Sequence, residues 1–275
     1  MNKKIIWIII IIAILLLGIV TTIAIVNEIG FNYKTEKISD YNYFVLEQDD
    51  KYGVIDKSGN IIIEAKYEAV QIPNPSKAVF VCIEKYNQEA KDYDTVVYNE
   101  KGEELYTNYK NIQAIAIFTN IDSTPYEKSV LTYKENGKYG LIDFNGKQIT
   151  KPVYDEISSI NYKEGTFLVK QNDLEGIINM KGKVIVKCEY ESVNSDNYFN
   201  EKDDIEEKLN TSQQAGFIVS KKTEDGYRYG YINYKGTTII KPEYTQLNRV
   251  TEITNDKNLY FVAFKNGQAR SFEKQ

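Results

Sequence analysis

The chain repeats a frame of 19 residues, and this repeat constrains its fold more than any other feature. One copy, at residues 139–157, reads YGLIDFNGKQITKPVYDEI. Three further copies align with it at residues 52–70, 175–193 and 229–247, and a more divergent fifth copy covers residues 95–112. Recurrence at this length is typical of repeat proteins, whose units stack on their neighbours. Frame residues are therefore expected to build units rather than to carry chemistry.

Each copy predicts a β-hairpin. In the segment from Asp143 to Gly146, the acidic residue comes first and glycine fourth, which is the spacing of a type I turn, and the glycine is free to adopt a positive φ. The residues on both sides are apolar or β-branched, as in paired strands. A further apolar segment precedes most copies, so each unit is predicted to be an antiparallel meander of three or four strands. The same turn spacing recurs at Asp56–Gly59, Asn99–Gly102, Asn179–Gly182 and Asn233–Gly236.

The repeat predicts an all-β domain over residues 41–275, with about five units and a terminal partial unit. Consecutive turn glycines are 43, 44, 36 and 54 residues apart, as expected when loops of different length interrupt a constant frame. Residues 259–272 resemble the opening two strands of a unit that stops early. The units are expected to form either a propeller-like ring or an open β-solenoid. The ring is favoured, because closure removes exposed sheet edges.

The N-terminus predicts a membrane anchor. Residues 5–26 carry no charge and would span roughly 30 Å as a helix, which is the thickness of a bilayer core. Lys3 and Lys4 favour a short cytoplasmic N-terminus over residues 1–4. Residues 27–40 then form a tether, and the β domain lies outside the cytoplasm at the cell membrane. A cleaved signal peptide is the alternative, although the apolar run exceeds the usual 7–15 residues and no A-x-A-like site follows.

Charge and cysteine content narrow the choice of partners. Residues 27–275 hold 32 of the 34 basic residues and all 39 acidic residues, a net charge of about −7. This balance argues against nucleic acid, which requires a basic surface. Cys82 and Cys188 lie in strand-like apolar segments, and we expect two buried thiols. A disulfide between them is the alternative in an exported domain.

The frame resembles the bacterial WG repeat, whose units carry an aromatic-Gly pair, then I-D-x-x-G-K, an apolar run and P-x-Y-D. The resemblance implies a repeat domain that serves as a binding or scaffold module. The tryptophan of the family pattern is replaced by tyrosine in three copies and by Glu175 in a fourth; a smaller ring packs less area. The predicted signature residues are Tyr52, Gly53, Asp56, Gly59, Tyr67, Gly102, Tyr139, Gly140, Asp143, Gly146, Pro152, Tyr154, Gly176, Asn179, Gly182, Tyr190, Tyr229, Gly230, Asn233, Gly236, Pro242 and Tyr244.

Tyrosine is abundant, with 23 residues, and falls into two groups. Tyrosines within the frame are expected to pack against the next unit. Those outside it are better candidates for a surface that binds sugars or peptides, because aromatic side chains are enriched where proteins meet partners. Their spacing does not join them into one site. The second group includes Tyr86, Tyr93, Tyr126, Tyr162, Tyr198 and Tyr227.

Several enzyme classes are excluded by composition. The chain has no histidine, so catalytic triads built on histidine and the usual zinc sites cannot form. No phosphate-binding or dinucleotide-binding glycine motif is present. Asp56 and Asp143 are expected to form turns rather than to bind calcium, because the neighbouring positions lack further oxygen ligands. We therefore expect no metal and no cofactor.

The sequence predicts a membrane-tethered, non-catalytic module that binds or organises a protein or cell-envelope partner. The alternative is a carboxylate-dependent hydrolase that acts on envelope glycan, because a pair of acidic residues is the one common catalytic apparatus left. No acidic pair stands out from the repeat pattern. A sensory ectodomain is a third possibility, although residues 1–4 are too few to carry a signal unaided.

Overall fold

A computed structural model describes residues 41–88, 92–117, 126–160, 165–197, 214–250 and 260–273. The expected anchor and tether, residues 5–26 and 27–40, lie outside these ranges. Residues Glu36–Gln275 form one compact unit. Within the described ranges, no helix is long and apolar enough to cross a membrane.

The described residues contain 21 β-strands and no helix, arranged in six antiparallel sheets that we name A to F. Sheet A contains β1 (Tyr43–Gln48), β2 (Lys51–Asp56) and β3 (Ile61–Tyr67). Sheet B contains β4 (Ala69–Gln71), β5 (Phe80–Asn87), β6 (Asp92–Tyr98) and β7 (Glu104–Leu105). Sheet C contains β8 (Gln113–Ala116), β9 (Tyr126–Glu135) and β10 (Lys138–Asp143).

Sheets D to F follow the same plan. Sheet D contains β11 (Glu156–Ser159), β12 (Thr166–Gln171), β13 (Leu174–Asn179) and β14 (Val184–Tyr190). Sheet E contains β15 (Ser192–Asn197), β16 (Gln214–Thr223), β17 (Gly226–Asn233) and β18 (Thr238–Tyr244). Sheet F contains β19 (Gln246–Val250), β20 (Tyr260–Lys265) and β21 (Gln268–Glu273). The predictions of an all-β fold and of antiparallel meanders are confirmed.

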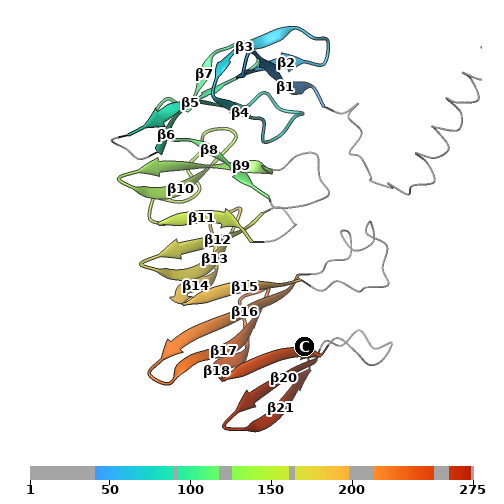
Figure 1. Cartoon of the computed structure of the whole chain (residues 1–275), viewed down its shortest axis with the longest axis vertical. Helices are drawn as coiled ribbons and strands as arrows, with labels where there is room; N and C mark the ends of the chain where they lie inside the picture. The colour runs from blue at the N-terminus through green and yellow to red at the C-terminus, as the bar shows by residue number, and fades with distance from the viewer. Residues whose placement is uncertain are drawn as a thin grey trace, which may run out of the picture. The chain divides into compact units, whose positions relative to one another are not determined.

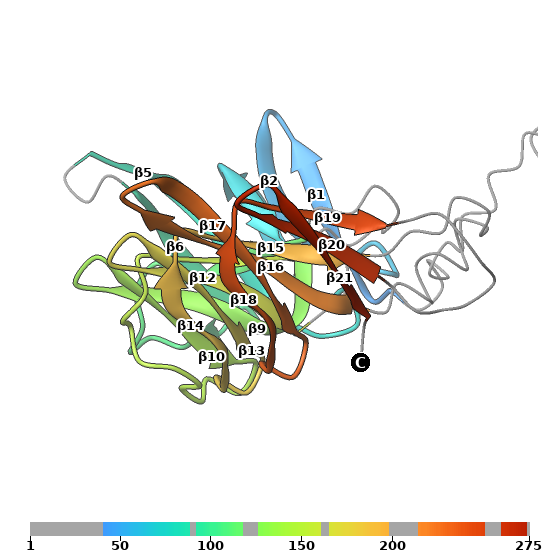
Figure 2. The ribbon, with the colours of Figure 1, turned by 90° about the horizontal axis from the view of Figure 1, so that it is seen from below.

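The six sheets follow one another in chain order, as Figure 1 shows for β1 through β21. Figure 2 looks along this row, so that the sheets lie one behind another. Among the described strands, no pairing joins sheet A to sheet F, and no apolar cluster contains residues of both. The ring favoured from the sequence is therefore not found in the part of the chain that the structure describes. A closed propeller requires a contact between the last sheet and the first, and the described residues of sheets A and F show none.

We call the glycine of each aromatic-Gly pair the frame glycine. The core lies between neighbouring sheets, because the two apolar residues after each frame glycine point to opposite faces of a strand. Leu141 packs in the cluster shared by sheets C and D, whereas the next residue, Ile142, packs in the cluster shared by B and C. Ile177 and Ile178 divide in the same way between the clusters on either side of sheet D. Every internal sheet is thus apolar on both faces, which is what allows the units to stack.

The chain passes from one sheet to the next at the tyrosine near the end of each frame. Tyr190 ends β14, Glu191 follows, and β15 of the next sheet begins at Ser192. The backbone N–H of Glu191 donates to the carbonyl oxygen of Ser220 in sheet E at 2.9 Å, which fixes the crossing. We call the four tyrosines at these crossings the corner tyrosines. They are Tyr67, Tyr154, Tyr190 and Tyr244, and their exposed fractions are 4%, 7%, 5% and 5%.

Glycine is required at the frame glycine position for a steric reason. A Cβ atom on Gly176 would lie 2.6 Å from the carbonyl oxygen of Val186 and 2.7 Å from the nitrogen of Cys188. Strand β14 therefore runs directly over this glycine, and the pairing of β13 with β14 shifts register there. Only a residue without a side chain allows this approach.

Candidate binding site

The frame turns use their polar residues to hold the backbone. In the β13–β14 turn, the Asn179 side-chain oxygen accepts hydrogen bonds from the backbone N–H groups of Lys181 and Lys183, both at 3.0 Å. Equivalent bonds form at Asp56, Asn99, Asp143 and Asn233. The fourth turn residues have positive φ, as glycine permits. They are Gly59, Gly102, Gly146, Gly182 and Gly236, with φ of 82°, 71°, 77°, 74° and 88°.

The remaining signature residues also lie in packing positions. The corner tyrosines contribute to four of the clusters between sheets. The aromatic residues before the frame glycines are half-buried, and so are the two prolines. These residues position the strands that carry other side chains. The half-buried residues are Tyr52, Tyr139, Tyr229, Pro152 and Pro242.

Ion pairs connect neighbouring sheets at equivalent positions. Lys221 of β16 lies 3.3 Å from Glu189 of β14, and Lys265 of β20 lies 3.0 Å from Glu243 of β18. All four side chains are more than a third exposed. Exposed pairs of this kind contribute at most about 1 kcal/mol each. They align adjacent units and do not form a concentrated charged site.

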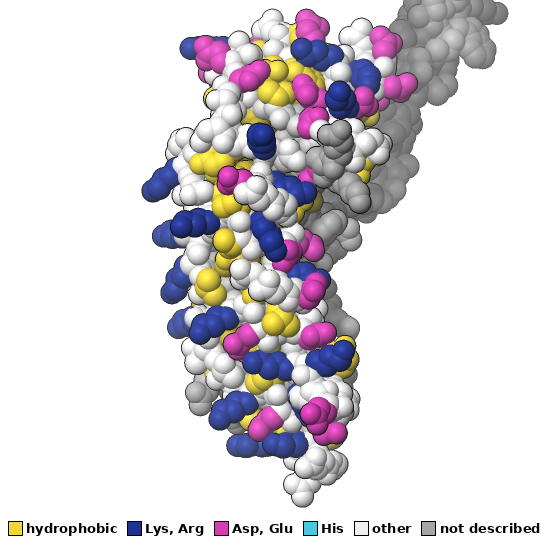
Figure 3. All heavy atoms as spheres, turned by 90° about the vertical axis from the view of Figure 1, so that its left-hand side faces the viewer, with side chains coloured by type: hydrophobic (Ala, Val, Ile, Leu, Met, Phe, Trp, Pro, Cys, Tyr) yellow, Lys and Arg dark blue, Asp and Glu magenta, His cyan; other side chains and the backbone are white. Residues whose placement is uncertain are grey.

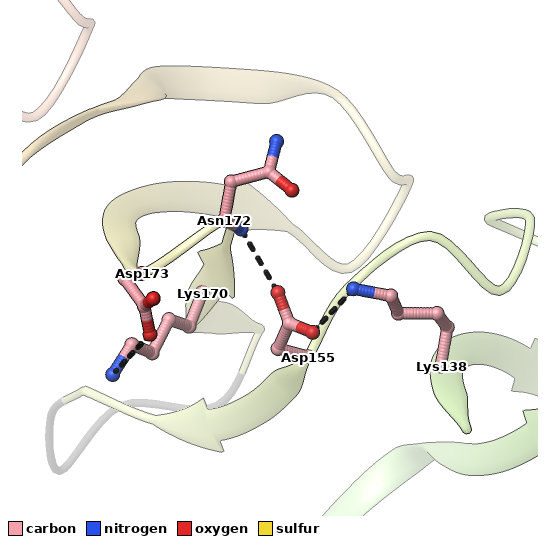
Figure 4. Close-up of polar contacts among 5 residues, drawn as sticks. All are labelled: Lys138, Asp155, Lys170, Asn172 and Asp173. Carbon is pink, nitrogen blue, oxygen red and sulfur yellow. Dashed lines mark hydrogen bonds and ion pairs between the residues drawn. The ribbon is translucent and has the colours of Figure 1, made fainter.

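Asp155 joins sheets C and D just after the corner tyrosine Tyr154 (Figure 4). It accepts hydrogen bonds from the Lys138 ammonium and, at 2.9 Å, from the backbone N–H of Asn172. The bond from Lys138 is the main reason that the pKa of Asp155 is lowered. Asp155 is therefore held as a carboxylate that supports the junction.

Lysine and arginine side chains line one margin of the face that Figure 3 shows, interspersed with acidic side chains. At the outer edges of sheets D and E, strands β14 and β18 carry the exposed lysines Lys187 and Lys241. Lysine on an edge strand discourages pairing with a strand of another molecule. Protection of the sheet edges explains why lysine occupies these two positions, and no bound ligand is needed to explain it.

Sheet B departs from the frame. In its copy the aromatic-Gly pair is replaced by Thr95 and Val96. The β5–β6 hairpin also contains a register shift after Ile83, beyond which Tyr86 pairs with Tyr93. Their ring centroids are 5.2 Å apart with an interplanar angle of 75°, and each residue is 44% exposed. The sequence marked both tyrosines as surface candidates but did not bring them together; the hairpin does.

A shallow hollow of about 610 Å³ adjoins this tyrosine pair. We call it the tyrosine hollow. The two rings meet nearly at a right angle. The lining also contains the Lys85 ammonium group and the Glu68 carboxylate, and Glu68 forms an ion pair with Lys51 at 2.7 Å. Aromatic planes with a few polar groups are typical of binding sites. The lining residues are Glu68, Ala69, Ile83, Lys85, Tyr86 and Tyr93.

Two other predicted surface tyrosines, Tyr126 and Tyr227, do not line this hollow. Tyr227 lies on β17 of sheet E and is 46% exposed, and Tyr126 of β9 is half-buried, which raises the pKa of its phenol. Tyr162 and Tyr198 lie outside the described residues. The tyrosine hollow is thus the place where two of the six candidates meet.

The cysteines lie in separate clusters. Cys82 is buried between sheets A and B, whereas Cys188 packs between sheets C and D, and both are free thiols. Burial raises the pKa of the Cys82 thiol to about 12 and also raises that of Cys188. Across the described ranges, no group of three or more potential metal ligands occurs.

Comparison with known families identifies four copies of the repeat. A family model described as "WG containing repeat" matches residues 52–74, 139–174, 176–200 and 229–267. The resemblance seen in the sequence is therefore supported in these four regions. The matches omit residues 75–138, which include most of the tyrosine hollow.

Other comparisons add little. None of the curated proteins matches this chain in sequence. A solved structure described as "Crystal structure of the eukaryotic initiation factor" is similar with a TM-score of 0.40 at 7% identity, over 84% of this chain and 62% of that one. This chain thus spans less than two thirds of that protein's length, and a similarity at this level supports no conclusion about fold or function.

Proposed function

We propose that this chain is a bacterial WG-repeat protein that binds a cell-envelope partner through the tyrosine hollow, without catalysing a reaction. Residues 5–26 anchor it in the cell membrane as a single helix, with residues 1–4 in the cytoplasm and the repeat domain outside. The four matched regions support the family assignment. The uncharged run of 22 residues supports the anchor.

The location of the tyrosine hollow is the observation that carries the binding proposal. In the other units, the tyrosines at the signature positions are buried or half-buried, namely Tyr52, Tyr67, Tyr139, Tyr154, Tyr190, Tyr229 and Tyr244. Tyr86 and Tyr93 are instead large, exposed aromatic residues on a hairpin outside the matched frame. Stacking does not require them at the surface. A partner that covers both rings would remove this apolar area from water, which is favourable.

The shape of the hollow favours glycan over protein as the partner. A sugar ring presents weakly positive C–H groups, which are attracted to the negative face of an aromatic ring. Tyr86 and Tyr93 offer two such faces nearly at right angles. The Glu68 carboxylate accepts hydrogen bonds from hydroxyl groups, and the Lys85 ammonium donates them. We therefore assign the hollow to an envelope glycan.

The hydrolase alternative has less support. Glycoside hydrolysis commonly uses two carboxylic acids about 5–9.5 Å apart on either side of the bond that is cleaved. The residues that line the hollow include one carboxylate, Glu68, which forms an ion pair with Lys51. Binding needs no second acid, so it is the function that this geometry favours.

Co-sedimentation tests the proposal. The full-length chain in detergent micelles is mixed with purified peptidoglycan sacculi, and pellets are compared for the wild type, Tyr86→Ala/Tyr93→Ala and the control Tyr227→Ala. We expect wild type and control to be retained at high salt and the double variant to lose at least tenfold in affinity. Equal retention of all three would refute the role of the hollow. Release of soluble sugar that stops in Glu68→Gln would instead establish the hydrolase.

A further inference from the structure

Six exposed lysines recur along one side of sheets C, D and E. Each of these sheets is followed or ended by a segment that carries a lysine three residues before the corner tyrosine. In sheets D and E, the frame turn that precedes this segment also carries lysine. Figure 3 shows basic side chains gathered along one margin of the face in view. We call the six residues the lysine stripe; they are Lys151, Lys181, Lys183, Lys187, Lys235 and Lys241.

Contacts between neighbouring sheets bring these lysines together. The frame turn of sheet D lies against the last segment of sheet C, because a Cβ atom on Gly182 would be 3.0 Å from the carbonyl oxygen of Ile149. In the same way, a Cβ atom on Gly236 of sheet E would meet the carbonyl oxygen of Ile185 in sheet D. A lysine of the stripe adjoins each glycine, and another follows each isoleucine by two residues. The stripe therefore continues from one sheet to the next.

Acidic side chains do not balance the stripe. The segments that carry it, residues 149–154, 180–190 and 234–244, contain six lysines and two acidic residues, Glu189 and Glu243. Both glutamates already form ion pairs with lysines of the next sheet. Among the described residues, no ion pair involves a lysine of the stripe. Neighbouring sheets lie about 10 Å apart, and the Debye length at physiological salt is about 8 Å, so these like charges still repel one another in part.

Protection of the sheet edges explains only part of the stripe. Lys187 and Lys241 lie on edge strands, where lysine discourages pairing with another chain. Lys181, Lys183 and Lys235 lie in turns instead, where there is no strand edge to protect. An anionic ligand that follows the stripe would relieve the repulsion among all six ammonium groups.

We propose that the lysine stripe binds a linear, flexible polymer of phosphate groups. Lysine presents a mobile point charge with three donors, whereas arginine favours a fixed, bidentate geometry. The three segments contain no arginine, which suits a flexible polyanion better than a single ligand of fixed shape. Contacts spread over three sheets favour a long chain, because each further phosphate binds at a high effective concentration. This site is separate from the tyrosine hollow, and neither proposal depends on the other.

Fluorescence anisotropy of end-labelled polymers tests the stripe, with the full-length chain in micelles of an uncharged detergent. The labelled probes are long-chain inorganic polyphosphate, poly(glycerol phosphate) and single-stranded DNA, and unlabelled triphosphate serves as a short competitor. We expect both phosphate polymers to bind, and their affinity to fall at least tenfold between about 50 mM and about 200 mM salt, since bound phosphates release counterions. Triphosphate should bind at least tenfold more weakly. Lys151→Gln/Lys187→Gln/Lys241→Gln should reduce the affinity for both polymers at least tenfold.

Two matched variants separate the effect of charge from that of folding. Arginine at the same three positions keeps the charge and should preserve binding. Lys57→Gln/Lys101→Gln/Lys222→Gln removes the same charge from exposed positions outside the stripe and should also bind like the wild type.

Four results would overturn the proposal: no binding of either phosphate polymer at low salt, equal affinity of the two glutamine variants, triphosphate binding as tight as that of the polymers, or tighter binding of DNA. If the stripe binds as expected, the tighter of the two phosphate polymers identifies the source of the ligand. A preference for poly(glycerol phosphate) indicates a phosphodiester polymer of the cell wall, and a preference for polyphosphate indicates the free inorganic polymer.

Discussion

Tyr231 of sheet E and Phe261 of sheet F lie with their ring centroids 4.5 Å apart in the last cluster of the row. Tyr231 is 1% exposed and Phe261 is 2% exposed. Among the described residues, this cluster is the apolar contact that sheet F makes with its neighbour. In a row of units that touch only their neighbours, stability is approximately a sum of unit and interface contributions.

Phe261→Ala should therefore detach sheet F while distant sheets remain folded. Truncation of a buried phenylalanine reduces the free energy of unfolding by about 3–5 kcal/mol. We expect loss of hydrogen-exchange protection across β20 and β21, with little change in sheets A to C. Phe264→Ala, which truncates a half-buried residue on the same strand, should have a smaller effect. Equal loss of protection in all six sheets would contradict an open row.

Gly230→Ala should damage the fold more than Gly226→Ala in the same strand. A Cβ atom at position 230 would lie 2.6 Å from the carbonyl oxygen of Ile240 and 2.7 Å from the nitrogen of Pro242, so β18 would have to move. We expect a loss of more than about 3 kcal/mol, the upper end for overpacking. A Cβ atom at Gly226 would face open space, so the cost of alanine there comes from the positive φ alone and is about 1–2 kcal/mol. Urea unfolding measures both, and the reverse order would be inconsistent with this packing.

Asp155→Asn should weaken the domain at neutral pH and have little effect at low pH. Lys138 holds the pKa of Asp155 below its ordinary value in the folded protein. The stabilisation is complete above the unfolded pKa of about 4 and disappears as pH falls through the lowered folded pKa. Urea unfolding at pH 7 and near pH 2 measures the difference. Asp173→Asn, whose side chain is 99% exposed, is the control. A difference between Asp155→Asn and wild type that grew on acidification would refute the sign.

The two thiols should react at different rates in the folded protein. Thiolate is the reactive form of cysteine, and burial raises the pKa of Cys82 to about 12. We expect a thiol reagent at pH 8 to modify the half-buried Cys188 first and Cys82 only slowly, and both to react rapidly in denaturant. Mass spectrometry identifies the modified residue. A mass 2 Da below that of the reduced chain would show a disulfide, contrary to the separation of the two clusters.

The sequence allowed prediction of those features that depend on local spacing. The Asn179 to Gly182 interval indicates a turn because both requirements lie within four residues, and the pair Ile177-Ile178 indicates two buried faces because strand side chains alternate. The meeting of Tyr86 and Tyr93 depends on the register of a hairpin outside the frame. Ring closure depends on rotation between sheets, which no local spacing specifies.

The binding role of the hollow is tested most directly by an NMR titration of the full-length chain in micelles with soluble glycan fragments released from peptidoglycan. We predict saturable shifts for the rings of Tyr86 and Tyr93 and the methyl groups of Ile83, with Tyr227 unchanged. Tyr86→Ala/Tyr93→Ala should abolish the shifts at Ile83. Saturable binding that shifts other residues and leaves these three unchanged would contradict the account, as would the absence of any shift at millimolar fragment.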